Sequence, residues 1–165
     1  MTNTALSALP YRPNAGVMLL NEAKHVFVGK RIDTDGHAWQ MPQGGIDKGE
    51  EAQAAALREL TEETGIAPEK AEIIASTEGW IKYDFPPELA ASLWLRRSGE
   101  PRYRGQKQRW FLLRFLGQDS DVNIATAHPE FSDWKWMPPS DLVAHIVPFK
   151  REIYRQVLSE FSPYL

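Results

Sequence analysis

The stretch GGIDKGEEAQAAALRELTEETGI (residues 44–66) decides how this chain is built. Its alanine-rich centre favours a helix that opens at Asp47 or at the Lys48-Gly49 step and runs to about Thr64. Gly65 is a typical residue just past the end of a helix. The reactive side chains of this stretch therefore lie on one helix and on the glycine-rich loop that precedes it.

Three glutamates of this helix, Glu59, Glu62 and Glu63, lie within an arc of about 80–100°. Like charges at this spacing destabilise a helix by about 0.2–0.5 kcal/mol per pair, whereas Leu57 and Leu60 point elsewhere and can anchor the helix in a core. Mg²⁺ prefers oxygen ligands and usually shares them with substrate phosphates. A divalent cation beside a phosphorylated substrate would turn the repulsion into coordination, although such a cluster taken alone is also compatible with a solvated acidic face.

The same stretch fits the pattern G-x5-E-x7-R-E-U-x-E-E-x-G-U, in which U is a bulky aliphatic residue. The pattern resembles the signature of the Nudix hydrolases. This resemblance implies an α/β fold, an α/β/α sandwich around a mixed β-sheet. It also implies metal-assisted attack of water on a phosphorus atom of a nucleoside diphosphate linked to another group. The fixed positions are filled by Gly44, Glu50, Arg58, Glu59, Leu60, Glu62, Glu63, Gly65 and Ile66.

Carried over by position, the resemblance makes Glu59, Glu62 and Glu63 metal ligands and the Gly44 carbonyl a further candidate ligand. It implies Mg²⁺ or Mn²⁺ as cofactor, with two or more ions that neutralise charge and lower the pKa of a bound water. An ion pair of Arg58 with Glu50 would hold the loop and the helix together. The general base stays open between Glu59, Glu63 and a glutamate outside the helix.

Four other stretches narrow the resemblance to one branch: YRPNAGVML (11–19), WQMPQGGID (39–47), GQKQRWFLL (105–113) and HPEFSDWKW (128–136). They are similar to the bacterial RNA pyrophosphohydrolases, which are close relatives of the dinucleoside polyphosphate hydrolases. The resemblance implies 5′-triphosphorylated RNA ends or dinucleoside polyphosphates, such as diadenosine tetraphosphate, as substrates. The motifs do not separate these two substrates.

Glu130 in HPEF matches an extra acidic residue of that branch and is a further candidate metal ligand or base. Two aromatic residues, Tyr83 and Phe149, are candidates for stacking on a base, which is worth about 1–3 kcal/mol; packing in the core is the alternative for both. Four cations are candidates for pairing with phosphates, and Lys107 is favoured because it enters a strongly apolar strand. The four are Arg12, Arg31, Lys107 and Lys150.

We expect residues 1–165 to form a single domain in which residues 1–10 are a flexible tail. A hairpin is predicted from the runs at 15–20 and 25–32, one or two strands at 71–85, a strong strand at 109–117, a short one at 134–137 and an amphipathic helix at 148–161. The segment from Arg96 to Arg109 contains six cationic residues and one acidic residue. We interpret this basic segment either as an RNA-binding segment or as a solvated loop. Residues 87–105 carry no clear motif and suggest a variable lid.

Composition limits the remaining classes of function. The chain has no cysteine, which excludes disulfides and thiolate chemistry. Its net charge is −3, so the molecule as a whole does not attract polyanions. The first residues lack the basic start and the apolar run of a secretory signal peptide. No apolar run in the chain is long enough to span a membrane. We therefore expect a cytoplasmic protein. Two alternative functions stay open: a house-cleaning nucleoside triphosphate or ADP-ribose pyrophosphatase, and a non-catalytic nucleotide-binding or RNA-binding module.

Overall fold

The computed structural model describes residues 7–33, 36–89 and 103–165 of the chain. The complete elements within the described residues are eight strands and three α-helices, with short 3-10 turns between them, and residues 87–89 are also helical. The helices are α2 (Ala52–Thr64), α4 (Leu142–His145) and α5 (Arg151–Phe161). The strands are β1 (Tyr11–Leu20), β2 (Val26–Arg31), β3 (Trp39–Gln40), β4 (Gln43–Gly45), β5 (Ala71–Ser76), β6 (Ile81–Asp84), β7 (Gly105–Phe115) and β8 (Phe131–Met137).

All eight strands belong to one mixed sheet whose central path is β3-β2-β1-β7-β5. β1 and β7 run parallel over ten residue pairs, whereas the other pairings are antiparallel. β4 pairs with the first half of β1, and β2 pairs with β1 only at its end, at Leu20 and Val26. Along this edge of β1, β4 therefore pairs with its first half and β2 with its last residue.

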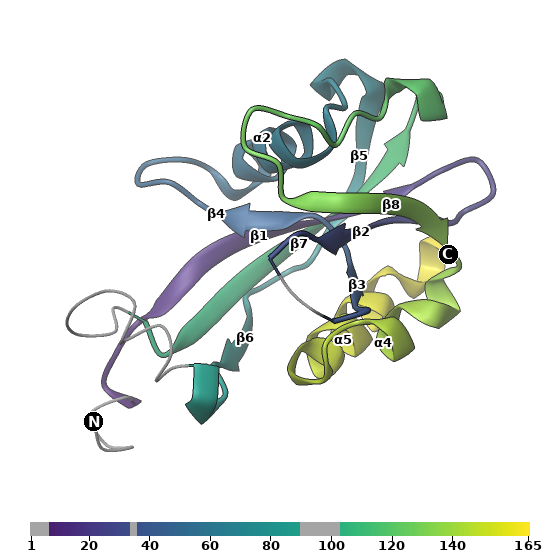
Figure 1. Cartoon of the computed structure of the whole chain (residues 1–165). Helices are drawn as coiled ribbons and strands as arrows, with labels where there is room; N and C mark the ends of the chain where they lie inside the picture. The colour runs from purple at the N-terminus through teal and green to yellow at the C-terminus, as the bar shows by residue number, and fades with distance from the viewer. Residues whose placement is uncertain (1–6, 34–35, 90–102) are drawn as a thin grey trace.

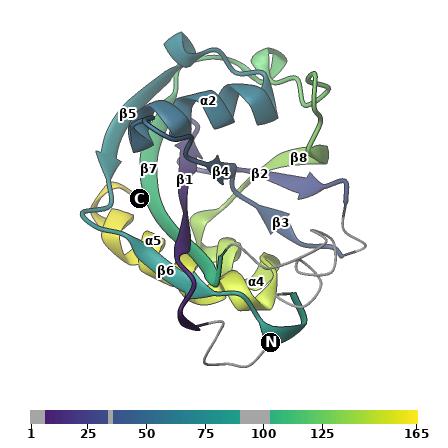
Figure 2. The same cartoon turned by 90° about the vertical axis from the view of Figure 1, so that its left-hand side faces the viewer.

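Helices cover both faces of the sheet, with α2 on one face and α4 and α5 on the other (Figures 1 and 2). Each face has its own core. Ala15, Val17 and Leu19 of β1 pack in the cluster that contains Leu60 of α2. Their neighbours on the opposite face of the strand pack in the cluster that contains Val157 and other residues of α5. The expected α/β/α sandwich around a mixed sheet is confirmed.

The hydrophobic pattern of β1 follows from this double coverage. Residues 14–20 are all buried, because a strand with a helix layer on each face has no solvent side. The predicted hairpin of β1 and β2 is confirmed. The stretch 71–85 forms two strands, β5 and β6, which pair with β7 one after the other. The C-terminal helix also forms as predicted and buries Ile153, Val157 and Phe161.

The helix of the acidic stretch begins at Ala52, later than the predicted start at 47–49. Gly49 has a φ of +81°, which the left-handed region allows for glycine, and Glu51 is extended. The backbone N–H of Asp47 donates to the Glu50 carboxylate, so residues 47–50 form a turn in place of the first helical turn. At the other end, Gly65 has a φ of +72° and terminates α2 as predicted.

Parts of three predictions lie outside the described residues: the tail up to residue 6, the candidate lid at 90–102, and the cations of the basic segment before Tyr103. Where the chain is described, no helix is both long and apolar enough to cross a membrane.

Candidate active site

Arg58 of α2 fastens the loop at residues 44–50 to the helix. Its Nε and Nη2 each donate to one oxygen of the Glu50 carboxylate, both at 2.9 Å, and Nη2 also donates to the Gly45 carbonyl at 2.9 Å. The Arg58 hydrogen bonds, helped by the Asp47 backbone N–H, lower the pKa of Glu50 to about 2. The ion pair expected between Arg58 and Glu50 is therefore present, and it is bidentate.

The same guanidinium also faces two of the three glutamates. Nη1 of Arg58 lies 3.0 Å from Glu59 and 3.2 Å from Glu62, so one cation offsets part of their repulsion. Glu62 is largely exposed, whereas Glu59 is mostly buried. Among the described side chains, no group of three or more acidic residues or histidines is gathered as a metal cage. A cation shared by Glu59 and Glu62 would compete with Arg58 for their oxygens.

Glu63 is the buried member of the set, with 3% of its surface exposed. Its carboxylate accepts a hydrogen bond from the backbone N–H of Gln43, and its Oε2 has no hydrogen-bond partner. Burial raises the pKa of Glu63 well above its usual range, and the nearby Glu59 and Glu130 raise it further. A buried carboxylate oxygen without a donor is costly unless something pairs with it. A hard divalent cation is the kind of partner that this oxygen fits.

Glu59 lies against Gly44 of β4, because a Cβ built on Gly44 would overlap the Glu59 carboxyl group. Burial is also the main cause that raises the pKa of Glu59, and the charges of Glu62 and Glu130 add to it. Glu130 precedes β8, where its carbonyl accepts from the backbone N–H of Ile32 at 3.0 Å. Helix α2 and the segment before β8 thus bring Glu59, Glu63 and Glu130 within electrostatic reach of one another.

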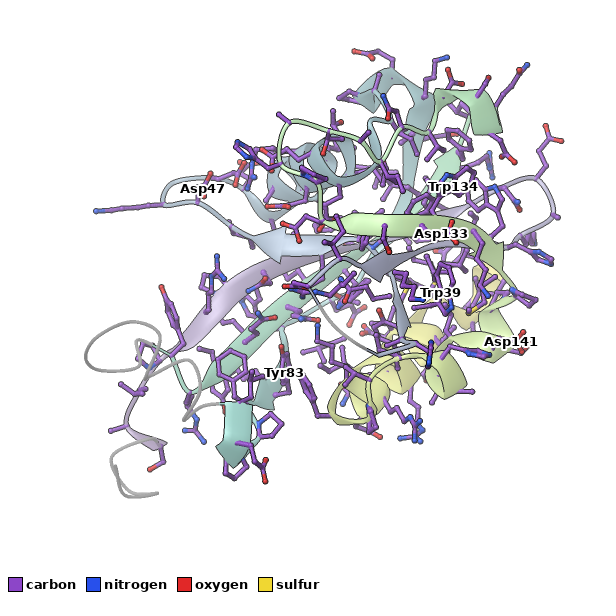
Figure 3. The ribbon with its side chains drawn as sticks, in the orientation of Figure 1. Trp39, Asp47, Tyr83, Asp133, Trp134 and Asp141 are labelled. Carbon is purple, nitrogen blue, oxygen red and sulfur yellow. The ribbon has the colours of Figure 1, made fainter. Side chains whose placement is uncertain are left out.

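Five of the predicted substrate-binding residues gather beside these acids. The Tyr83 and Phe149 rings lie 6.0 Å apart, centroid to centroid. Burial raises the pKa of Tyr83, while the charges of Arg12 and Arg31 lower it, which places both guanidinium groups nearby. Burial lowers the pKa of Lys150 to about 8, with Arg31 lowering it further and Glu63 raising it. Figure 3 shows Tyr83 on the α5 side of the sheet.

Lys107 lies elsewhere. It is paired with Lys82, and Gln106 is paired with Tyr83. Side chains alternate along a strand, so Lys107 shares the α2 face with Phe111, while Gln106 shares the opposite face with Tyr83. The predicted pairing of Lys107 with a phosphate would therefore take place on the other face of the sheet from Tyr83. Period-two counting along β7 puts Lys107 and Gln106 on opposite faces, but it does not say which face holds the site.

Sequence reasoning missed three polar residues of the site. Gln43 donates from its backbone to Glu63, and its side-chain oxygen accepts from the buried Gln108 amide at 3.1 Å. Asp33 holds the Arg31 guanidinium, with the Nε of Arg31 at 2.7 Å. Gln43 and Gln108 stand inside the quoted motifs, and a polar amide at the start of a strongly apolar strand was a signal that could have found Gln108, which is buried.

Comparison with known proteins identifies the family to which this fold and site belong. The model of the NUDIX domain family matches residues 10–157. An RNA pyrophosphohydrolase of Roseobacter denitrificans is 58% identical over 165 residues, which cover all of both chains. Among solved structures, the E. coli dihydroneopterin triphosphate pyrophosphohydrolase aligns with a TM-score of 0.68 at 22% identity, covering 92% of this chain and 99% of that one. A C. elegans Ap4A hydrolase aligns with a TM-score of 0.61 at 19% identity, with the same two coverages.

Proposed function

The chain belongs to the Nudix hydrolases, and from this premise we propose that it hydrolyses a phosphoanhydride bond in 5′-triphosphorylated RNA ends and in dinucleoside polyphosphates such as diadenosine tetraphosphate. The full-length similarity to an RNA pyrophosphohydrolase supports RNA ends as the main substrate. The structural similarity to an Ap4A hydrolase supports the shared fold. A location in the cytoplasm stays a prediction.

Nudix hydrolases generally use divalent cations such as Mg²⁺ or Mn²⁺. For this chain, the residues proposed to hold the ions are Glu59, Glu62, Glu63, Glu130 and the Gly44 carbonyl. The partnerless Oε2 of buried Glu63, close to two other carboxylates, is the observation that carries this proposal. Bound there, the ions would supply charge neutralisation and a water of lowered pKa.

The protein's own part is positioning. Arg58 fixes residues 45 and 50 relative to the helix, so the loop that faces the substrate keeps one shape. On the α5 side, Arg12, Arg31 and Lys150 would offset phosphate charge, because Arg12 and Arg31 lie near Tyr83, and Arg31 and Lys150 lie near Glu63. Such an arrangement catalyses phosphoryl chemistry mainly by orientation and electrostatic stabilisation.

On the same side, Tyr83 and Phe149 would offer ring faces on which a nucleobase stacks. Their rings are tilted by 37° and their centroids are 6.0 Å apart, and Tyr83 also contacts Phe85 edge-on at 5.9 Å. Stacking on aromatic rings tolerates every base. A site built this way suits both an RNA end of any sequence and the adenosine of a dinucleotide. The proton acceptor stays open between Glu59, Glu63 and Glu130.

Product analysis tests the proposal. Triphosphorylated RNA and diadenosine tetraphosphate would be compared under the same conditions, with Mg²⁺ and again with excess chelator. We expect pyrophosphate and 5′-monophosphorylated RNA from the first, AMP and ATP from the second, and neither with chelator. Nucleoside triphosphates and ADP-ribose complete the panel. Release of AMP and ATP with little pyrophosphate from RNA would assign the dinucleotide as the main substrate, and faster turnover of ADP-ribose than of both would contradict the proposal.

A further inference from the structure

A second groove lies on the α2 side of the sheet, away from Tyr83 and Phe149. Its volume is about 630 Å³. One wall consists of Trp80, directly before β6, and of Lys107 and Arg109 from β7. The other wall is the turn at residues 46–51 with the first residues of α2, and Figure 3 shows Asp47 of this turn on the opposite side of the sheet from Tyr83. The first wall takes no part in the site described above, because Lys107 lies on the other face of the sheet from Tyr83.

The strand wall is positively charged and not neutralised. Lys107 stands directly opposite Lys82 on the neighbouring strand, and like charges in that position destabilise a sheet. The Nε atom of Arg109 is buried without a hydrogen-bond partner. None of the ion pairs formed by the described side chains involves these three cations. The Nη2 atom of Arg109 donates to the Thr77 carbonyl at 3.5 Å. An anion bound here would remove the repulsion between Lys82 and Lys107.

Aromatic rings alternate with these cations. Trp80 is 41% exposed, and the Lys107 ammonium lies 4.6 Å from its ring centroid. The Lys82 ammonium lies 5.5 Å from the centroid of Tyr11, the neighbouring ring along the same face. Cations that follow a backbone, with rings on which bases stack, are the features of surfaces that bind single-stranded nucleic acid.

The acidic wall does not cancel this character. The wall has three carboxylates, and two of them face Arg58: Glu50 forms two hydrogen bonds with it and Asp47 lies 3.7 Å from it. The third, Glu51, lies on the same wall as the cation Lys48, which balances its charge. Phosphates entering the groove would therefore meet the strand wall, with Lys107 and Arg109, as its cationic side.

The groove is close to the catalytic loop. Gly44, Ala15 and Arg109 are register neighbours across β4, β1 and β7, so Gly44 and Arg109 are two strand spacings apart, about 10 Å. Glu59 lies over Gly44 on this same face. A chain whose 5′ end is at the acids can pass around the turn at 46–51 and reach the strand wall.

We propose that this groove, together with Lys82, is an accessory RNA-binding surface that holds nucleotides downstream of the hydrolysed 5′ end. The inference rests on the proposed RNA substrate and extends it, because a dinucleoside polyphosphate has no further chain to place there. RNA ends would then be preferred through contacts outside the catalytic site.

Binding without turnover tests this surface. The probe is a 5′-monophosphorylated RNA octanucleotide, with AMP as the short reference, and Kd is measured by fluorescence anisotropy or by competition over a range of salt concentrations. The double variant Lys82→Ala/Lys107→Ala should reduce the slope of log Kd against log salt for the octanucleotide by about 1.4, or about 0.7 per lost phosphate contact. The variant Trp80→Ala should raise the Kd of the octanucleotide about fivefold or more.

The matched control removes two cations at the other end of the molecule. Arg114 is exposed near the end of β7, and Lys24 is exposed in the β1–β2 turn with a φ of +60°, which asparagine tolerates. The variant Lys24→Asn/Arg114→Ala should keep the wild-type slope. Equal slopes for all proteins, an equal loss in the control, or wild-type binding of the octanucleotide no tighter than that of AMP would overturn the inference. Neither probe contains a phosphoanhydride bond, so neither is hydrolysed. A negative result would therefore contradict the binding surface without contradicting the proposed activity, which the product assay tests separately.

Discussion

Gly44 provides the space that the Glu59 carboxylate occupies, because any side chain at position 44 would overlap that carboxyl group. Gly44 is not in the left-handed region of φ, so backbone conformation alone does not require glycine there. The requirement comes from a helix residue fifteen positions along the chain. The glycine of the loop and the glutamate of the helix therefore act as one unit in the candidate metal site.

The variant Gly44→Ala should retain the fold and lose activity. Its Cβ would displace the Glu59 carboxylate by about 1 Å or more, and misplacement of this size costs about 100-fold in rate. Steady-state kcat with Mg²⁺, together with the metal concentration at half-maximal activity, measures the effect. Gly79 is the matched control, since a Cβ there meets nothing within 4 Å. Equal activity of Gly44→Ala and Gly79→Ala would remove Glu59 from the site.

Glu62→Gln should abolish most of the turnover while the protein stays folded. The side chain is 57% exposed, so the substitution costs little stability, but it removes a charge proposed to hold a cation. Loss of about 3 kcal/mol of transition-state stabilisation corresponds to about 100-fold in kcat. The exposed Glu69 provides the control variant Glu69→Gln, which should behave as wild type. Unchanged turnover of Glu62→Gln in Mg²⁺ would mean that the metal is held elsewhere.

The Glu50–Arg58 pair should make stability depend on pH in the acid range. The pKa of Glu50 is lowered to about 2 in the folded protein, against about 4.5 for an unperturbed carboxyl group. The folded state thus favours the ionised form, so the contribution is fully present above pH 4.5 and is lost as the pH falls toward 2. Urea unfolding of wild type and Glu50→Gln should show a difference in free energy that is largest near neutral pH and shrinks below pH 4.5.

The variant Glu69→Gln is again the reference for that measurement. An exposed substitution of this kind changes the free energy of unfolding by about 0.5 kcal/mol or less. A pH-independent difference between wild type and Glu50→Gln would show that the ion pair adds nothing beyond the packing of the side chain.

Lys150 should make substrate affinity depend on pH in the alkaline range. Burial lowers its pKa to about 8, so the ammonium group is present below that pH and is lost above it. If the ammonium binds a phosphate, KM should rise as the pH increases through about 8. In Lys150→Arg, the guanidinium stays charged and KM should stay flat across the same range. Superimposable profiles of KM against pH for the two proteins would exclude this contact.

Phe149→Ala separates base stacking from core packing. Loss of one stacking surface should raise KM for a nucleotide substrate about fivefold or more with kcat little changed. Tyr164, which is also aromatic and 43% exposed, lies near the C-terminus, so Tyr164→Ala is the matched control and should leave KM unchanged. A lowered Tm with an unchanged KM would identify Phe149 as a core residue.

Much of the chemistry was readable from the sequence because its carriers are close together along the chain. The spacing of Glu59, Glu62 and Glu63 places them on one side of any helix, and Gly65 ends that helix whatever it packs against. Runs such as residues 109–117 predicted strands for the same reason. The start of α2 was placed too early, because the hydrogen bonds of Asp47 and Glu50 form a turn that competes with the first helical turn.

The sequence by itself determined the acidic helix, its loop and the class of reaction that they support, since these depend on local spacing. Tertiary structure decided the rest. Only the strand register puts Arg12, Tyr83 and Gln106 on one face and Lys107 on the other. Only packing leaves Glu63 buried with a partnerless oxygen while Glu62 stays in solvent. Contacts between distant segments set both outcomes, and no local spacing encodes which face of a sheet or which side of a helix becomes buried.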